Sequence, residues 1–145
     1  MNAYMNQYQN NQVQTASREQ ILLMLYDGAI RFVRQSREAI EAKDNAAKLL
    51  YADKAIAILT EFRNTLDHEV GGEIARNLDA LYEFMIRELV RAKISNTAAV
   101  LDPVLRILRE LRETWEQAIE IARRDGTTAA GATAPANAQP LRAVL

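Results

Sequence analysis

Side chains that carry out catalysis are scarce in this sequence. His68 is the one imidazole, and the chain has no cysteine. Disulfide bonds, thiol nucleophiles and thiolate metal sites are therefore excluded, and the two Glu-x-x-His units of a di-iron bundle are absent. No glycine-rich loop follows a strand pattern, so there is no sign of a phosphate-binding loop. We expect a protein that is not an enzyme and that uses no cofactor or metal.

His68 leaves one catalytic alternative open, which is a helical phosphorelay module that carries a phosphoryl group on this ring. Such a ring needs small neighbours and a nearby cation on the body of a helix. His68 instead stands between Asp67 and Glu69 at a predicted helix end. Acidic neighbours repel a phosphate and its donor. A plain surface histidine is the better interpretation.

Charge and hydropathy limit the kinds of partner that the protein can bind and indicate its cellular location. The formal net charge is −1, which removes the main argument for nucleic acid or an anionic membrane surface as a partner. The longest apolar run, Ile21 to Tyr26, is far too short to cross a bilayer, and the first residues do not resemble a signal peptide. These features indicate a cytoplasmic protein without membrane insertion.

The elements that must carry any site are helices. Apolar residues recur at steps of three and four between residues 17 and 125, and strand-like alternation is nowhere sustained. The fold predicted from this pattern is all-α, an antiparallel four-helix bundle over 17–125. Residues 1–16 form a separate N-terminal segment, extended or a small helix, and residues 126–145 are expected to be a disordered tail.

Local signals predict the helix boundaries. Ser17 and Gln20 have the spacing of a capping box at the start of the first helix. Pro103 predicts a kink or a restart at Asp102 before the last helix. The other predicted turns are Asp44-Asn45, Gly71-Gly72 and Ser95-Asn96-Thr97. On the third helix, the predicted inward residues are Ile74, Leu78, Leu81, Met85, Leu89 and Ala92.

Apolar residues cover more of these helices than mutual packing requires. On the first helix, with Leu25 and Phe32 at one edge, they extend over about 200°, whereas a bundle helix needs little more than about 100°. The second helix adds Tyr51 and Ile58 beside Phe62. One explanation is a thick bundle whose broad flanks touch two neighbours each. Another is an exposed groove for a partner, and a third is self-association into a structural dimer.

The N-terminal segment fits the groove interpretation. Tyr4, Tyr8 and Val13 stand among Asn and Gln in a stretch too short for a core of its own. Such a segment can rest its aromatic rings on the bundle and cover an apolar site, as a weak and reversible lid. The alternative is that the tyrosines simply anchor a structured N-terminus.

Three stretches of the sequence resemble the flagellin-specific export chaperones of the FliS family. They are TASREQILLMLYDGAI (Thr15 to Ile30), GGEIARNLDALYEFM (Gly71 to Met85) and LRILRELRETWEQA (Leu105 to Ala118). Their order and spacing match as well, and so does the preceding AYMNQYQNNQV (Ala3 to Val13).

The resemblance implies a cytoplasmic, non-catalytic chaperone with an antiparallel helical-bundle fold. Members of the family bind the C-terminal segment of flagellin, keep it from polymerising early and help to pass it to the flagellar type III export gate. Their N-terminal aromatic segment covers part of the binding surface. Further partners implied here are export-gate components, with the chaperone a monomer or weak homodimer.

The resemblance also bears on individual positions. Tyr26-Asp27-Gly28 matches a family hallmark, and we interpret Gly28 as permitting close helix approach. Lys93 and Pro103 depart from the family pattern and leave the path of residues 93–104 open. The candidate partner-binding residues are Tyr4, Tyr8, Val13, Tyr26, Asp27, Gly28, Tyr51, Ile58, Phe62, Ile107 and Leu111.

Overall fold

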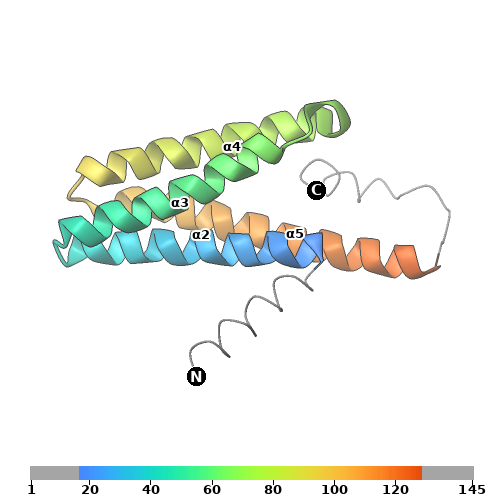
Figure 1. Ribbon diagram of the computed structural model, residues 1–145, viewed down its shortest axis with the longest axis horizontal. Helices are drawn as coiled ribbons and strands as arrows, with labels where there is room; N and C mark the ends of the chain where they lie inside the picture. Colours follow the sequence, from blue (N-terminus) through green and yellow to red (C-terminus); the bar gives the residue numbers. More distant parts are fainter. Residues whose placement is uncertain (1–16, 129–145) are drawn as a thin grey trace, which may run out of the picture.

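Four long helices form a bundle in the computed structural model (Figure 1), which describes residues 17–128. Each helix runs antiparallel to the next one along the chain. These helices are α2 (Arg18–Glu41), α3 (Asn45–Thr65), α4 (His68–Ile94) and α5 (Asp102–Thr128), and a 3-10 turn, η1 (Ala98–Leu101), precedes α5. The prediction of an all-α antiparallel bundle is confirmed. Predictions about Tyr4, Tyr8 and Val13, and about the tail from residue 129 on, lie outside the described residues.

The start of α2 and the turn into α3 follow the predicted capping chemistry. The Gln20 N–H donates to Ser17 Oγ at 3.2 Å, and the Ser17 N–H donates to Gln20 Oε1 at 3.0 Å, which completes the capping box. The chain then reverses at Lys43, in the left-handed region at φ 57°. Asp44 caps α3 by accepting a hydrogen bond from the Ala47 N–H at 3.1 Å.

The prediction that the second helix continues to the Gly71-Gly72 pair is wrong. α3 ends at Thr65, and Asp67 caps α4 by accepting from two backbone N–H groups, each at 3.0 Å. The glycine pair lies inside the first turns of α4, where Gly72 (φ 50°, ψ −121°) interrupts the helical geometry. A carboxylate cap starts the new helix before the glycines, and Gly72 supplies a kink, because its positive φ carries little strain for glycine. His68 is therefore exposed at the beginning of a helix and not at its end.

The link from α4 to α5 confirms the predicted turn and restart. α4 ends at Ile94, and the Thr97 N–H donates to Ser95 Oγ at 3.0 Å. After η1, α5 begins at Asp102 with Pro103 in its first turn, where the missing N–H of proline breaks no helical hydrogen bond. α5 passes the predicted end near Asp125-Gly126 and continues to Thr128.

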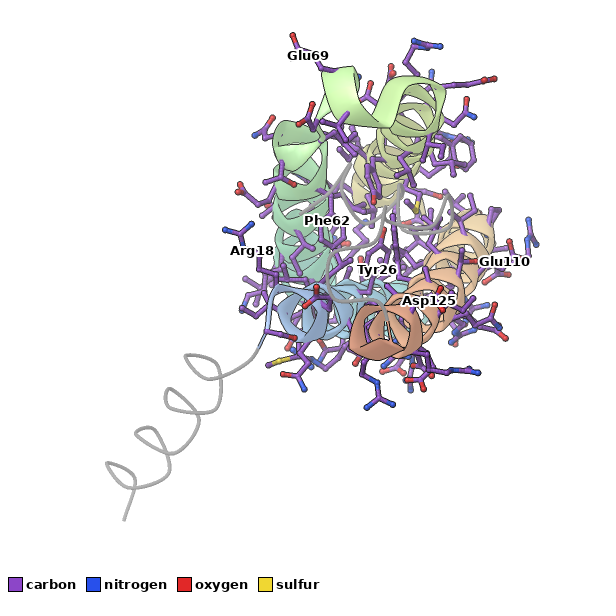
Figure 2. The ribbon with its side chains drawn as sticks, turned by 90° about the vertical axis from the view of Figure 1, so that its right-hand side faces the viewer. Arg18, Tyr26, Phe62, Glu69, Glu110 and Asp125 are labelled. Carbon is purple, nitrogen blue, oxygen red and sulfur yellow. The ribbon has the colours of Figure 1, made fainter. Side chains whose placement is uncertain are left out.

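The helices lie around the core in the order α2, α3, α4, α5, as the view along the bundle shows (Figure 2). α2 packs extensively on α3 and on α5, and α3 packs on α4. α4 meets η1 but has little contact with α5 itself. The bundle is thus closely packed on three of its four sides.

The buried stripe of α4 differs from the predicted one at two positions. Ala75 and Tyr82 are fully buried, whereas Ile74 is 37% exposed and Leu81 is half-buried. Hydrophobicity alone favours isoleucine and leucine over tyrosine in the core. The hydroxyl of Tyr82, however, finds a hydrogen-bond partner on another helix, which removes the penalty for burying it.

Candidate partner-binding surfaces

An aromatic cluster joins all four helices at the centre of the bundle. It consists of Tyr26 of α2, Phe62 of α3, Tyr82 of α4 and Trp115 of α5. The ring of Phe62 stacks on Tyr26 at a centroid distance of 4.6 Å and lies 5.4 Å from Tyr82. Trp115 Nε1 donates to the Tyr26 hydroxyl at 3.0 Å, and the two tyrosine hydroxyls are 2.5 Å apart. Figure 2 shows Tyr26 and Phe62 pointing inward between the helices.

The electrostatics of this cluster keep it neutral. Burial raises the pKa of Tyr26 to about 12, although its hydrogen bonds with Tyr82 and Trp115 act in the opposite direction. Burial, followed by the proximity of Tyr26, also raises the pKa of Tyr82 above its ordinary value. Tyr26 and Phe62 were candidate partner-binding residues, and the structure places both where they hold the helices together.

A first surface with apolar side chains lies along α2 and α3. We call it the α2–α3 face, and it consists of Leu25, Phe32, Tyr51 and Ile58, with the buried Gly28 next to Ile58. The rings of Phe32 and Tyr51 stack at a centroid distance of 6.2 Å and an interplanar angle of 17°. Leu25 stands seven residues before Phe32, hence on the same side of α2, and is 37% exposed. The predicted residues Gly28, Tyr51 and Ile58 are thus brought together.

Two positively charged side chains lie over the ring of Phe32 on the α2–α3 face. The Arg31 guanidinium carbon and Lys54 Nζ are 5.1 Å and 5.4 Å from the centroid of Phe32. The α2–α3 face therefore presents positively charged groups next to its apolar side chains.

The interpretation that glycine at position 28 permits close helix approach needs correction, because the helices do not require a glycine there. A Cβ placed on Gly28 would lie 3.5 Å from Ile58 Cδ1, which is ordinary van der Waals contact. The spacing of α2 and α3 therefore leaves room for an alanine at this position. A larger side chain would have to displace Ile58.

A second apolar surface lies where α4 faces α5. Ion pairs fix the orientation of both helices: Arg112 of α5 pairs with Asp27 of α2, and Arg63 of α3 pairs with Asp79 of α4 at 2.8 Å. The opposite sides of α4 and α5 therefore face one another. We call these sides the α4–α5 flank, and its residues are Ile74, Leu81, Ile107, Leu111 and Ala118.

The α4–α5 flank is only partly covered. Ile107, Leu111 and Ala118 pack against the core but remain half-buried. Ile107 and Leu111 were candidate partner-binding residues and now share one surface. Ile74 and Leu81 were missed as candidates because the hydrophobic pattern assigned them to the core. The pairing of Asp79 with α3, which would have shown that they face elsewhere, is not visible in a one-dimensional pattern.

Asp27 has a structural partner in the free protein. Its carboxylate accepts from Nε and Nη2 of Arg112, which also donates to Glu116. The equivalent pair on the other side, in which Arg63 donates to both oxygens of Asp79, holds the pKa of Asp79 below its usual range. These exposed pairs orient the helices more than they stabilise them.

No helix within residues 17–128 is long and apolar enough to cross a membrane. In the same residues no group of three or more His, Asp and Glu side chains gathers that could hold a metal ion.

A four-helix bundle with a neutral buried centre and two partly covered apolar surfaces defines an all-α helical-bundle protein. The sequence matches the family described as flagellar protein FliS over residues 1–122. It is 36% identical over 118 residues to the flagellar secretion chaperone FliS of Bacillus subtilis, covering 81% of this chain and 87% of that protein. The chain therefore belongs to the FliS family, which is a family of chaperones and not of enzymes.

Two more relatives extend the comparison. The flagellar secretion chaperone FliSB of Pseudomonas aeruginosa is 39% identical over 116 residues, covering 77% of this chain and 92% of that protein. FliS of Salmonella typhimurium is 40% identical over 106 residues, covering 72% and 78%.

Proposed function

We propose that this chain is a cytoplasmic export chaperone that binds the C-terminal segment of flagellin. It would keep that segment from polymerising and aid its delivery to the flagellar type III export apparatus, with export-gate components as further partners. The observation that supports this proposal most directly is that the bundle keeps two partly covered apolar surfaces after its helices have packed. Membership of the FliS family agrees with it.

The placement of the two surfaces favours an extended ligand. α2 and α3 lie on one side of the bundle and α4 and α5 on the other (Figure 2), so one straight helix does not reach both surfaces. A flagellin segment that assembles by helix packing is amphipathic and sticky when unpaired. Such a segment can lay successive apolar stretches on the two surfaces, and the free energy of ordering it reduces the net affinity.

The proposed contact residues follow from this arrangement. Tyr51 and Ile58 contribute from the α2–α3 face, and Ile107 and Leu111 from the α4–α5 flank. Tyr26, Gly28 and Phe62 act from inside the bundle by positioning these residues, and Asp27 exchanges its intramolecular ion pair for a polar contact at the rim. Tyr4, Tyr8 and Val13 belong to the proposed lid, which the flagellin segment displaces.

Titration of a C-terminal flagellin peptide tests this proposal. Ile58→Ser and Leu111→Ser should each weaken binding about tenfold or more, because each removes apolar contact from one surface. Val90→Ser is the matched control, since Val90 is 50% exposed on α4 and belongs to neither surface. Equal affinity for all four proteins would overturn the assignment of the surfaces.

Size-exclusion chromatography separates the proposal from self-association. The chaperone should elute as a monomer or weak dimer that forms a defined complex with the peptide. A stable homodimer that leaves the peptide free contradicts it. Deleting residues 1–14 should leave the bundle folded and increase the binding of an apolar dye, and unchanged dye binding would count against a lid.

A further inference from the structure

Lys48 is a buried cation at the end of the bundle where α2 turns into α3. Its side chain and backbone are 5% exposed. Its backbone carbonyl accepts from Ser36 Oγ at 3.0 Å, which fixes its place on α3. Its ammonium donates to the Ser95 carbonyl at 3.3 Å, in the loop after α4. A buried charge is unfavourable unless it is paired and hydrogen-bonded.

Lys48 has no counter-charge inside the described bundle. No ion pair to Lys48 exists among residues 17–128, and Glu41, which lines a pocket together with Lys48, pairs with Arg37. Residues 1–16 and 129–145 contain neither Asp nor Glu, so no side-chain carboxylate can come from them. An ammonium has three N–H donors, and one of them is used here.

A pocket of about 540 Å³ lies beside this lysine. Most of its lining is polar, and several of the lining groups donate hydrogen bonds, as an oxyanion site requires. Lys43, in the turn at φ 57°, lines the pocket, and Asn96 comes from the loop that also supplies Ser95. The residues around the pocket are Ile40, Glu41, Lys43, Asn45, Lys48, Ser95 and Asn96.

We propose that this pocket binds an oxyanion and that, in the chaperone complex, the oxyanion is a carboxylate of the bound flagellin segment. The second half of this inference rests on the proposed function, and the first does not. A carboxylate in the pocket supplies the missing counter-charge of Lys48. It also gives the partner a polar anchor at the end of the bundle, where apolar contacts alone leave its position along the helices unspecified.

Thermal unfolding of the full chain with inorganic phosphate tests the oxyanion site. Low millimolar phosphate should raise the melting temperature of the unmodified protein by a few degrees, in a saturable way, relative to chloride at equal ionic strength. Lys48→Met should lose this rise, whereas Lys54→Met, on the exposed side of the same helix, should keep it. In chloride alone, Lys48→Met should be at least as stable as the unmodified protein, because the unpaired buried charge is gone.

Two results would overturn the site. One is a phosphate effect of equal size in Lys48→Met, which identifies general exclusion of phosphate from the surface. The other is the absence of any saturable effect in the unmodified protein. If Lys48→Met does not fold, Asn96→Ala at the exposed rim replaces it and should weaken phosphate binding at least threefold in calorimetry.

A second pair of titrations tests the identity of the anion. A C-terminal flagellin peptide should bind Lys48→Met about tenfold more weakly than the unmodified protein. A peptide with its Asp and Glu changed to Asn and Gln, and with an amidated end, should not distinguish the two proteins. Equal binding of the native peptide to both proteins overturns the carboxylate assignment. A peptide that binds neither protein overturns the proposed function and leaves the phosphate result standing.

Discussion

The two opposite sides of the bundle are built differently. On α2, the small residues Gly28 and Ser36 contact α3 beside the larger rings of Tyr26 and Phe32, and the two helices pack along their length. α4 and α5 have little contact with one another and are each held mainly by the helix on their other side. The comparison teaches that a bundle can be fully folded with one side incompletely closed. Apolar residues on that side remain available to another chain.

The largest expected effect contrasts the centre of the bundle with its incompletely closed side. Phe62→Ala should lower the free energy of unfolding by about 3 to 5 kcal/mol, because it opens a cavity between four helices. Leu111→Ala should lower it by only about 1 kcal/mol, because Leu111 is half-buried. Chemical denaturation followed by circular dichroism measures both values. Equal losses would mean that α4 and α5 pack as closely as α2 and α3.

Removing either buried tyrosine hydroxyl should lower the stability by a smaller amount, and the loss should be larger at Tyr26 than at Tyr82. Tyr26→Phe leaves the buried indole N–H of Trp115 without its acceptor and should cost about 1 to 3 kcal/mol of stability. Tyr82→Phe keeps the bond between Trp115 and Tyr26 and should cost roughly half as much. Denaturant midpoints of the two variants provide the comparison, and the reverse order would show that the hydroxyl pair dominates.

The smallest expected effect is a gain in stability from a substitution between the closely packed helices α2 and α3. Gly28→Ala should raise the free energy of unfolding by up to about 1 kcal/mol, because alanine favours helix and the added methyl group meets Ile58 at an ordinary distance. Gly28→Leu serves as the contrasting variant and should be destabilising, since it displaces Ile58. A loss of stability in Gly28→Ala would show that the two helices approach more closely than the structure indicates.

Local chemistry made most of the fold predictable. The capping box at Ser17, the cap at Asp44 and the restart at Asp102 depend on residues close in sequence, and each is confirmed. The break predicted at Gly71-Gly72 is present as the kink at Gly72, but the second helix already ends at Thr65 and Asp67 caps a new one. The sequence did not show that both signals would act within a few residues of one another.

The candidate site was less predictable because it depends on which helices face one another. Ile107 can be singled out from its position beside the inward stripe of the last helix, whereas the same pattern places Leu111 on that stripe. Tyr82 and Ile74 exchanged their expected roles, because burial of Tyr82 depends on a hydroxyl partner on a different helix. Long-range pairs such as Arg63 with Asp79 decide these orientations, and no short-range pattern contains them.

The position of Trp115 has a practical consequence for spectroscopy. It is the one tryptophan of the chain, it is 3% exposed, and its indole N–H donates to a tyrosine that contacts two further helices. Its fluorescence emission wavelength therefore reports the polarity of the junction between all four helices, without any attached dye. A ligand that wedges α4 away from α5 would admit water to this indole and shift the emission to the red, whereas a ligand confined to the outer surface would leave the spectrum unchanged.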